Sequence, residues 1–241
     1  MSITICFDFG NTRCKAAIFK NDVLHEIVFL ENASTKNVQD LMDQWKPDKT
    51  ILSSVIHHDK SIETLLSKST HFHLLGPSTK LNFTTPVGKP ETIGADRLAL
   101  CSAAVHLFPQ KHVLAIALGT CITYNYINNR AEFIGGSISP GMQMRFRSMH
   151  EQTALLPIIP PSNEFTLAGY DTKTNILSGV ILGIAAEIDG IIGAYEEKYG
   201  NFNVLLTGGD LSYFVPHLKK RIFADQNLIF KGLYAISEKN N

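Results

Sequence analysis

The sequence has no net charge and no basic stretch interleaved with aromatic residues. Its 241 residues include 22 Lys and Arg against 22 Asp and Glu, and its isoelectric point is near 7.1. Nucleic acids and acidic membrane surfaces attract proteins that carry an excess of positive charge. The composition therefore predicts neither of them as a partner.

Cysteine is scarce, and its spacing argues against the common structural uses. The four cysteines form no Cys-x-x-Cys pair and lie inside apolar segments, at positions 6, 14, 101 and 121. This pattern favours buried free thiols in a reducing cytoplasm over disulfides or a zinc site. The nine histidines are scattered, and neither His57-His58 nor His71 and His73 have an acid or Cys at metal-ligand spacing. We therefore expect solvated or loop histidines rather than metal ligands.

The sequence also lacks a recognisable secretory leader and a long uninterrupted apolar run. It opens at once on the strand-like segment 3–7, with no basic region or cleavage site. The longest apolar stretch, 180–192, contains Glu187 and Asp189, and we expect it to be too short and too charged to cross a bilayer. The catalytic motifs GxxxxGK and GxSxG do not occur.

What is present is an alternation of strands and helices, twice over. The first half predicts strands at 3–9, 13–19, 24–30, 50–55 and 72–75, a helix capped by Thr35 or Asn37, and helices at 61–67 and 95–107. The second half predicts strands at 113–118, 121–127, 131–134 and 203–206, with helices at 142–151, 173–199 and 232–239. We therefore expect an α/β protein with two similar domains, 1–110 and 111–241, and a cleft between them.

The helix predicted at 173–199 carries apolar residues at every fourth position from Ile176 to Ile192, which gives it one apolar stripe. Its glycines at 179, 183 and 190 each lower helix propensity by about 1 kcal/mol relative to Ala. We expect close packing against a sheet or another helix to compensate for that cost.

Two short segments repeat one local pattern about 110 residues apart, which predicts a duplicated fold. In each, an apolar strand runs into Gly and a small polar residue before a second apolar strand: Gly10-Asn11-Thr12 in the first copy and Gly119-Thr120 in the second. A glycine there lets the backbone approach an anion, and the nearby N–H groups and hydroxyl can bind phosphate oxygens. Asp8 precedes the first turn, whereas Ala117 occupies the matching place before the second.

Two acidic residues are candidates for chemistry. Asp8 either caps a turn or holds Mg²⁺ and phosphate, since carboxylate oxygens suit Mg²⁺. Lys15, and with less support Arg13, would add positive charge there. Asp96 lies at the first turn of a predicted helix and either stabilises that helix end or accepts a proton from an attacking hydroxyl, with Arg97 pairing an anionic part of the substrate. The segment 207–210 is equally compatible with an ordinary turn and with a loop on which a purine ring lies.

Taken together, these segments resemble the type III pantothenate kinases of the actin/hexokinase/Hsp70-like superfamily. The resemblance runs in order through nearly the whole chain: Asp8 to Thr12, Pro90 to Arg97, Gly119 to Thr123, Gly135 to Gly141, Thr153 to Pro157, Asp171-Thr172, Thr207 to Gly209, and the stretch from Asn227 to Leu233. It implies an actin-like (ribonuclease H-like) fold. It also implies ATP-dependent phosphorylation of pantothenate to 4'-phosphopantothenate, the first step of coenzyme A biosynthesis.

The resemblance also implies roles for particular residues. ATP with Mg²⁺ would contact residues of the first turn and one of the second: Asp8, Phe9, Gly10, Asn11, Thr12, Arg13, Cys14, Lys15 and Thr120. Pantothenate would contact Gly94, Ala95, Asp96, Arg97 and Thr172, with Asp96 as the general base. The family further implies a cytoplasmic homodimer whose substrate site is completed at the subunit interface, and a monovalent cation such as K⁺ or NH₄⁺.

Three positions depart from the family pattern. Ala117 replaces an Asp associated with the monovalent cation, Asn125 stands where a second Asp is common, and Val87 replaces a Tyr of the pantothenate loop. A non-catalytic regulatory or binding protein that retains the kinase fold is therefore the alternative function, because a fold alone does not determine activity. A kinase for another small alcohol is a third, and it would not need the Gly94–Arg97 signature.

Overall fold

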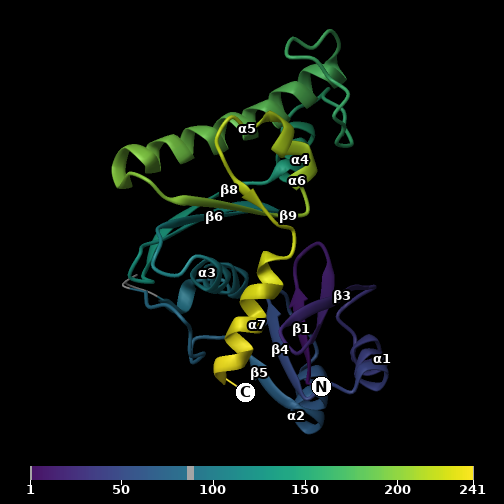
Figure 1. The fold of residues 1–241 in the computed structure, drawn as a ribbon. Helices are drawn as coiled ribbons and strands as arrows, with labels where there is room; N and C mark the ends of the chain where they lie inside the picture. The colour runs from purple at the N-terminus through teal and green to yellow at the C-terminus, as the bar shows by residue number, and fades with distance from the viewer. Residues whose placement is uncertain (1, 86–89, 241) are drawn as a thin grey trace. The chain divides into compact units, whose positions relative to one another are not determined.

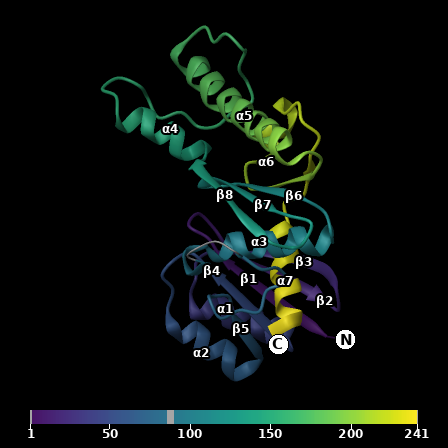
Figure 2. The same cartoon turned by 90° about the vertical axis from the view of Figure 1, so that its left-hand side faces the viewer.

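The computed structural model describes residues 2–85 and 90–240 (Figures 1 and 2). Contacts between residues divide the chain into two compact units. Unit 1 comprises Met1–Gln110, Ile127–Ile134 and Asn227–Asn241, and unit 2 comprises Lys111–Tyr126 and Gly135–Gln226. The contact units are not contiguous in the sequence, and the division into domains 1–110 and 111–241 stays a prediction. The cleft between the domains stays a prediction.

Unit 1 is built on a five-stranded sheet of order β3-β2-β1-β4-β5. Its strands are β1 (Ile3–Phe9), β2 (Cys14–Lys20), β3 (Val23–Leu30), β4 (Lys49–Ser54) and β5 (His71–Leu74). The first three form an antiparallel meander, whereas β4 and β5 run parallel to β1. The carboxyl ends of β1 and β4 therefore lie at one edge of the sheet, where open α/β sheets bind their ligands.

The two faces of this sheet carry different residues because side chains alternate along a strand. Ile5, Phe7 and Phe9 of β1 pack in a cluster with buried residues of α1 (Thr35–Trp45) and α2 (Lys60–Ser69). Helices α3 (Ala95–Leu107) and α7 (Leu228–Asn240) contact the sheet as well: α7 packs on β1 and β4, and α3 on β4. By the alternation, Asp8 lies on the face opposite Phe7 and Phe9.

The capping residue predicted for α1 is wrong. Ser34, rather than Thr35 or Asn37, is the N-cap, and its hydroxyl accepts a hydrogen bond from Asn37 N at 3.3 Å. Ser, Thr and Asn all cap helices, so the residue types alone could not show which of the three is the N-cap. The other helices of unit 1 begin within one residue of the prediction, apart from α7, which begins at Leu228 rather than at 232.

Helix α7 belongs to unit 1, although it is the last element of the chain. It packs along α3, and Gly232 approaches the α3 backbone so closely that a Cβ there would overlap the Ala99 carbonyl. Phe19 of β2 and Tyr234 of α7 stack with ring centroids 4.5 Å apart. These contacts explain why the contact units differ from the predicted domains: the core of unit 1 needs a segment that follows unit 2 in the sequence.

Unit 2 contains most of a second five-stranded sheet, of order β10-β9-β6-β7-β8. Its strands are β6 (Val113–Leu118), β7 (Cys121–Ile127), β8 (Phe133–Pro140), β9 (Asn203–Gly208) and the short β10 (Phe223–Ala224). Strand β8 runs on through Gly135 and Gly136, beyond the end predicted for it at residue 134. The reason is close approach: a Cβ on Gly136 would overlap the Tyr124 carbonyl of β7.

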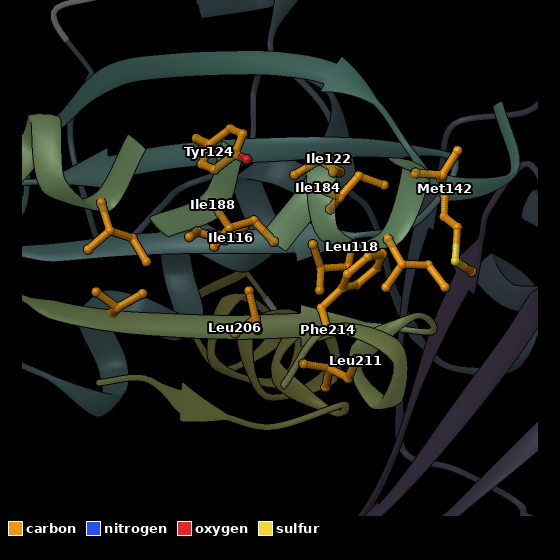
Figure 3. Packing of buried hydrophobic residues seen from close by; sticks show 14 of the residues in the cluster. Ile116, Leu118, Ile122, Tyr124, Met142, Ile184, Ile188, Leu206, Leu211 and Phe214 are labelled. Atoms are coloured by element: carbon orange, nitrogen blue, oxygen red, sulfur yellow. The ribbon is translucent and has the colours of Figure 1, made fainter. Parts of the chain in front are cut away.

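Helix α5 (Thr172–Tyr199) forms the hydrophobic core of unit 2 together with its sheet. The predicted stripe is confirmed, because its apolar side chains are buried: Ile176, Val180, Ile184, Ile188 and Ile192. Figure 3 shows Ile184 and Ile188 among Ile116, Tyr124 and Leu206 of the sheet. Helix α4 (Met142–Glu151) and the short α6 (Leu211–Phe214), which sequence reasoning missed, add Met142 and Phe214 to this cluster.

The glycines of α5 have no close packing partner in the described part of the chain. Apart from their chain neighbours and the nearby backbone of α5 itself, no atom there lies within 4 Å of a Cβ built on Gly179, Gly183 or Gly190. They lie on the exposed side of the helix, away from the buried stripe. The stretch 180–192 was expected to be too short and too charged to cross a bilayer. The 28-residue helix that contains it is long and apolar enough to do so by length and composition. Half of that apolar window is buried in the protein, as in the core helix of a globular unit.

Candidate active site

The turn between β1 and β2 is tight and carries exposed polar residues. Gly10 N donates to Arg13 O at 3.1 Å, and the strands resume at the pair Phe9 and Cys14. Asn11 and Thr12 are exposed, whereas Phe9 and Cys14 are buried. The structure thus brings together the predicted turn residues 8–15, with those at its tip accessible to a ligand.

Asp8 sits in a row of residues that crosses the sheet. It pairs with Lys15 of β2 and with Ser53 of the parallel strand β4, and Lys15 pairs in turn with Phe29 of β3. Burial, which removes water from the carboxyl group, raises the pKa of Asp8 to about 7. Lys15 lowers that pKa and Asp96 raises it, both by smaller amounts. A carboxyl group of this kind gains from a bound cation, so the site fits a divalent metal carried by a phosphate ligand.

Lys15 and Arg13 are directed to one aromatic ring. The Lys15 Nζ lies 5.5 Å from the centroid of the Phe29 ring, and the Arg13 guanidinium carbon lies 5.7 Å from it. Burial lowers the pKa of Lys15, Asp8 raises it, and Arg13 lowers it further. Phe29 was not singled out by sequence reasoning, because only the strand register shows that it adjoins Lys15.

Asp96 is held against the N-terminal end of α3. Its Oδ1 accepts a hydrogen bond from the Arg97 N–H at 2.9 Å, and Gly94 is the N-cap, with no side-chain hydrogen bond. A Cβ added to Gly94 would come within 2.6 Å of Asp96 Oδ1, so the carboxylate lies over the glycine. The charge of Asp96 also raises the pKa of Asp8, so the two candidate carboxylates lie close enough in unit 1 for their charges to interact.

Arg97 follows Asp96 and is supported by an aromatic ring. Its guanidinium carbon lies 5.5 Å from the centroid of the Phe133 ring, at the start of β8. Phe133 is anchored in turn, because its N–H donates to Thr84 O at 2.8 Å. Four of the pantothenate residues implied by the resemblance, Gly94 to Arg97, thus form the start of α3, whose position is fixed by these contacts. Val87 lies outside the described residues.

A cavity of about 530 Å³ opens beside the first turn and is lined by Asn11 and by the segment that follows β4, residues 54–57. The wall of this cavity is fixed from α2: His58 Nδ1 lies 3.0 Å from Ser54 Oγ, and His58 Nε2 lies 3.1 Å from Glu63 Oε1. Sequence reasoning treated His58 as a solvated histidine. His58 directly precedes the N-cap of α2 and Glu63 lies in the first turn of that helix, and this spacing is the signal that could have indicated the contacts.

The second turn, between β6 and β7, has a different construction. Gly119 N donates to Cys121 O at 3.2 Å and Gly141 N donates to Thr120 O at 3.0 Å. Thr120 is exposed, as a phosphate contact requires. A Cβ on Gly141 would overlap the carbonyls of Gly119 and Thr120, and one on Gly208 would overlap Leu118. The backbone of the segment 207–210 thus packs directly against the strand end before this turn, at Gly208.

Ala117 pairs with Thr207 of β9, which brings no carboxylate to this position. Asn125 is fully buried, and its amide donates to Ala115 O at 3.1 Å and to Thr123 Oγ1 at 3.2 Å. An Asp at that position could not donate these bonds. Throughout residues 2–85 and 90–240, no group of three or more His, Cys, Asp and Glu side chains is arranged to hold a metal ion.

Sequence reasoning missed a network of charged and polar groups that lies next to Gly141, the neighbour of the second turn. Glu187 of α5 forms an ion pair with Arg145 of α4 and accepts hydrogen bonds from Tyr124 OH at 2.9 Å and Ser139 Oγ at 2.5 Å. Arg145 Nε also donates to Pro140 O at 2.9 Å. Despite partial burial, these bonds hold the pKa of Glu187 below its usual value. The network ties β7, β8, α4 and α5 together next to Gly141.

Thr172, the remaining candidate, begins α5 in unit 2. It lines a second cavity of about 320 Å³ together with Asn175, Ile176, Met149 and Leu156. The start of the helix is fixed by a capping box, in which Asp171 accepts from Thr174 N at 2.7 Å. This places the Thr172 hydroxyl at a defined helix start beside a partly apolar hollow.

Solved structures define the class of protein. A conserved protein of Campylobacter jejuni, described as a Baf family transcriptional activator, matches with a TM-score of 0.61 at 21% identity over 98% of both chains. A glucokinase from an Antarctic psychrotroph matches with a TM-score of 0.52 at 9% identity over 99% of both chains. At such identities the likeness concerns the fold alone, which is the duplicated α/β fold of the actin-like ATPases and sugar kinases. The predicted fold class is confirmed.

Sequence comparison identifies the family within that class. The family model of type III pantothenate kinases matches residues 4–194. A type III pantothenate kinase from Christiangramia forsetii is 40% identical over 99% of each chain, and one from Bacteroides fragilis is 37% identical over 99% of each. The chain belongs to the type III pantothenate kinase family. It is an enzyme that phosphorylates pantothenate with ATP in coenzyme A biosynthesis, and the comparisons give no support to the alternative of a non-catalytic protein.

Proposed function

We propose that Asp96 is the general base of this kinase. The observation that carries the proposal is the position of its carboxylate, laid over Gly94 at the start of α3 and electrostatically coupled to Asp8. The carboxylate accepts the proton of the primary hydroxyl of pantothenate as that oxygen forms its bond to the γ-phosphorus of ATP and the bond to the leaving ADP oxygen breaks. Gly94, Ala95 and Arg97 hold the pantothenate, and Arg97 pairs with its anionic group.

Asp8 and the first turn hold the other substrate. Bound Mg²⁺ neutralises phosphate charge in a transfer of this kind. The carboxylate of Asp8 would hold that ion together with the phosphates. Lys15 and the turn from Phe9 to Cys14 contact the phosphate chain of ATP, and Thr120 contacts it from the second turn. The exposure of Asn11, Thr12 and Thr120 supports these contacts.

The test is Asp96→Asn, which keeps the shape of the side chain and removes its proton affinity. General base catalysis contributes about 10²–10⁴-fold to a rate, so kcat for pantothenate should fall by that order. Binding of Mg·ATP should stay within about twofold of the parent protein. Glu91→Gln, an exposed acid in the preceding turn Pro90–Thr92, is the matched control and should leave kcat unchanged. A folded Asp96→Asn protein with normal turnover would refute the assignment.

We further propose that the enzyme is a cytoplasmic homodimer in which Thr172 contacts pantothenate. Large apolar side chains near the start of α5 are left in solvent: Leu155 is 93% exposed, Leu167 84% and Tyr170 80%. The exposed side of α5 carries Gly179 and Gly183, which permit another helix to approach closely. Sedimentation of the purified protein at several concentrations tests this. A monomer that retains full turnover would contradict the dimeric site.

Neither a membrane nor nucleic acid is proposed as a partner, since the chain has no net charge and the apolar α5 is the core helix of unit 2. For the monovalent cation we propose a weak K⁺ or NH₄⁺ site. Without a carboxylate at Ala117, the remaining ligands are neutral oxygens, and neutral oxygens attract a cation less strongly.

A further inference from the structure

The row of side chains across the first sheet contains two residues that no proposed role uses, and one of the two is exposed. On the face opposite the Phe7 and Phe9 cluster, strand pairing sets four residues in register: Ser53, Asp8, Lys15 and Phe29. Ser53 is neutral and fully buried, and Asp8 and Lys15 belong to the proposed phosphate site. Phe29 is 61% exposed, which is unusual for a large aromatic side chain on a sheet.

Two cations lie against that exposed ring. Lys15 Nζ and the Arg13 guanidinium carbon lie 5.5 and 5.7 Å from its centroid, within the range in which the face of a ring attracts a cation. Asp8, in contrast, is the direct cross-strand partner of Lys15, yet within the described part of the chain Lys15 forms no ion pair with it. The Lys15 ammonium group could turn to Asp8 or to Phe29, and in the structure it lies against the Phe29 ring.

We propose that Phe29 is a positioning residue that draws Lys15 and Arg13 away from Asp8. The carboxylate of Asp8 then stays available to the metal, and both cations stay available to phosphate. Without the ring, the Lys15 ammonium would fold onto Asp8, because an opposite charge at close range is its strongest remaining partner. That internal ion pair would occupy both groups at once and compete with Mg·ATP. This inference rests on the proposed role of the first turn.

The test compares Phe29→Leu, which keeps apolar bulk but loses the aromatic face, with Phe29→Trp, which keeps that face. An exposed cation–π contact contributes about 0.5–1 kcal/mol, which corresponds to a roughly two- to fivefold change in an equilibrium constant. We expect Phe29→Leu to weaken Mg·ATP binding by at least that factor, and Phe29→Trp to restore it. Affinity for pantothenate should not change.

Phe223→Leu is the matched control. Phe223 is also exposed and also lies beneath an arginine, with Arg221 5.7 Å from its ring centroid, but it is on β10 of unit 2. Its substitution should leave Mg·ATP affinity unchanged. In a Lys15→Met, Arg13→Gln background, Phe29→Leu should have no further effect, because the ring then has no cation to hold.

A second measurement needs no nucleotide. A ring face shifts the resonances of a nearby Lys side chain, so the Hε signals of Lys15, assigned with Lys15→Arg, should be displaced in the parent protein and return to ordinary values in Phe29→Leu. Unchanged Lys15 signals, or displaced signals whose loss leaves Mg·ATP affinity intact, would overturn the inference. A parent protein that does not bind Mg·ATP would instead refute the proposed function.

Discussion

The turns after β1 and after β6 look alike in sequence but are built differently. The first has charged residues beside it, namely Asp8, Lys15 and Arg13, and its tip is open. The second has Ala117 instead of a carboxylate, and the backbones of Gly141 and Gly208 lie against it. The same strand–glycine pattern is thus used once to place charges and once to bring backbones together. Substitutions in the two turns should have effects of different kinds.

The largest expected effect is on stability, and it should appear in the second turn. Gly208 has φ +113, and a Cβ there would overlap the backbone of Leu118. Gly208→Ala should lower the free energy of unfolding by more than about 3 kcal/mol, because neither backbone can move aside easily. At Gly10 a Cβ would lie 3.2 Å from Arg13 O, so Gly10→Ala should cost only about 1 kcal/mol. Urea unfolding of both variants measures the difference, and equal losses would contradict the comparison.

The next effect is on nucleotide binding and should appear in the first turn. Asp8→Asn removes the charge that orients the metal, so Mg-dependent ATP affinity and turnover should fall by about 10²-fold, equivalent to about 2.7 kcal/mol. Thr120→Ala, in the second turn, removes one neutral hydroxyl and should cost tenfold or less. Titration calorimetry with and without Mg²⁺ distinguishes them. If both substitutions weaken binding equally, charge is not what separates the two turns.

The same Asp8→Asn change should stabilise the protein at high pH in the absence of metal. Because the pKa of Asp8 is raised from 3.8 to about 7, the folded protein holds that proton more tightly than the unfolded chain does. Stability is therefore lost as the pH rises between those two values. The gain from Asp8→Asn should be greater at pH 8 than at pH 5 by about 2 kcal/mol. Unfolding in EDTA at both pH values tests this, and a gain independent of pH would show that the Asp8 pKa is ordinary.

The smallest effect concerns the cation and would make the two turns more alike. Ala117→Asp restores a carboxylate beside the second turn, so it should lower the K⁺ concentration for half-activation by about tenfold or less. Activity is measured in KCl against choline chloride at constant ionic strength. A K⁺ requirement that is already tight and does not respond to Ala117→Asp would place the cation elsewhere.

Local patterns in the sequence predicted much of this molecule. The strand alternation and the apolar stripe of α5, which repeats every fourth residue, identified its main elements. Asp8 and Asp96 were singled out as candidates, and their roles stay predictions. Patterns that depend on pairing were not predictable in this way. Phe29 adjoins Lys15, and Phe133 supports Arg97, only through strand register and tertiary packing. Glu187 was read as a charge that interrupts an apolar run, because its partners Arg145 and Tyr124 are distant in sequence.

The glycines of α5 show the opposite failure. Their helix propensity predicted a close packing partner, yet they face away from the core of unit 2. Gly136 and Gly208, for which no close neighbour was predicted, lie against neighbouring backbones. A glycine in a sequence indicates that a side chain is missing. It does not show which neighbour, if any, takes up the space.

The position of α7 has a consequence for how the protein is made. Gly232 sits against Ala99 and Tyr234 against Phe19, so the first sheet is covered by residues that leave the ribosome after unit 2. Unit 1 cannot complete its core until unit 2 has been synthesised, although most residues of unit 1 precede unit 2 in the sequence. A chain that stops before Asn227 would retain the residues proposed to bind ATP and pantothenate, yet leave α3 uncovered. We therefore expect truncated products to be degraded or to aggregate rather than to persist as partly active enzyme.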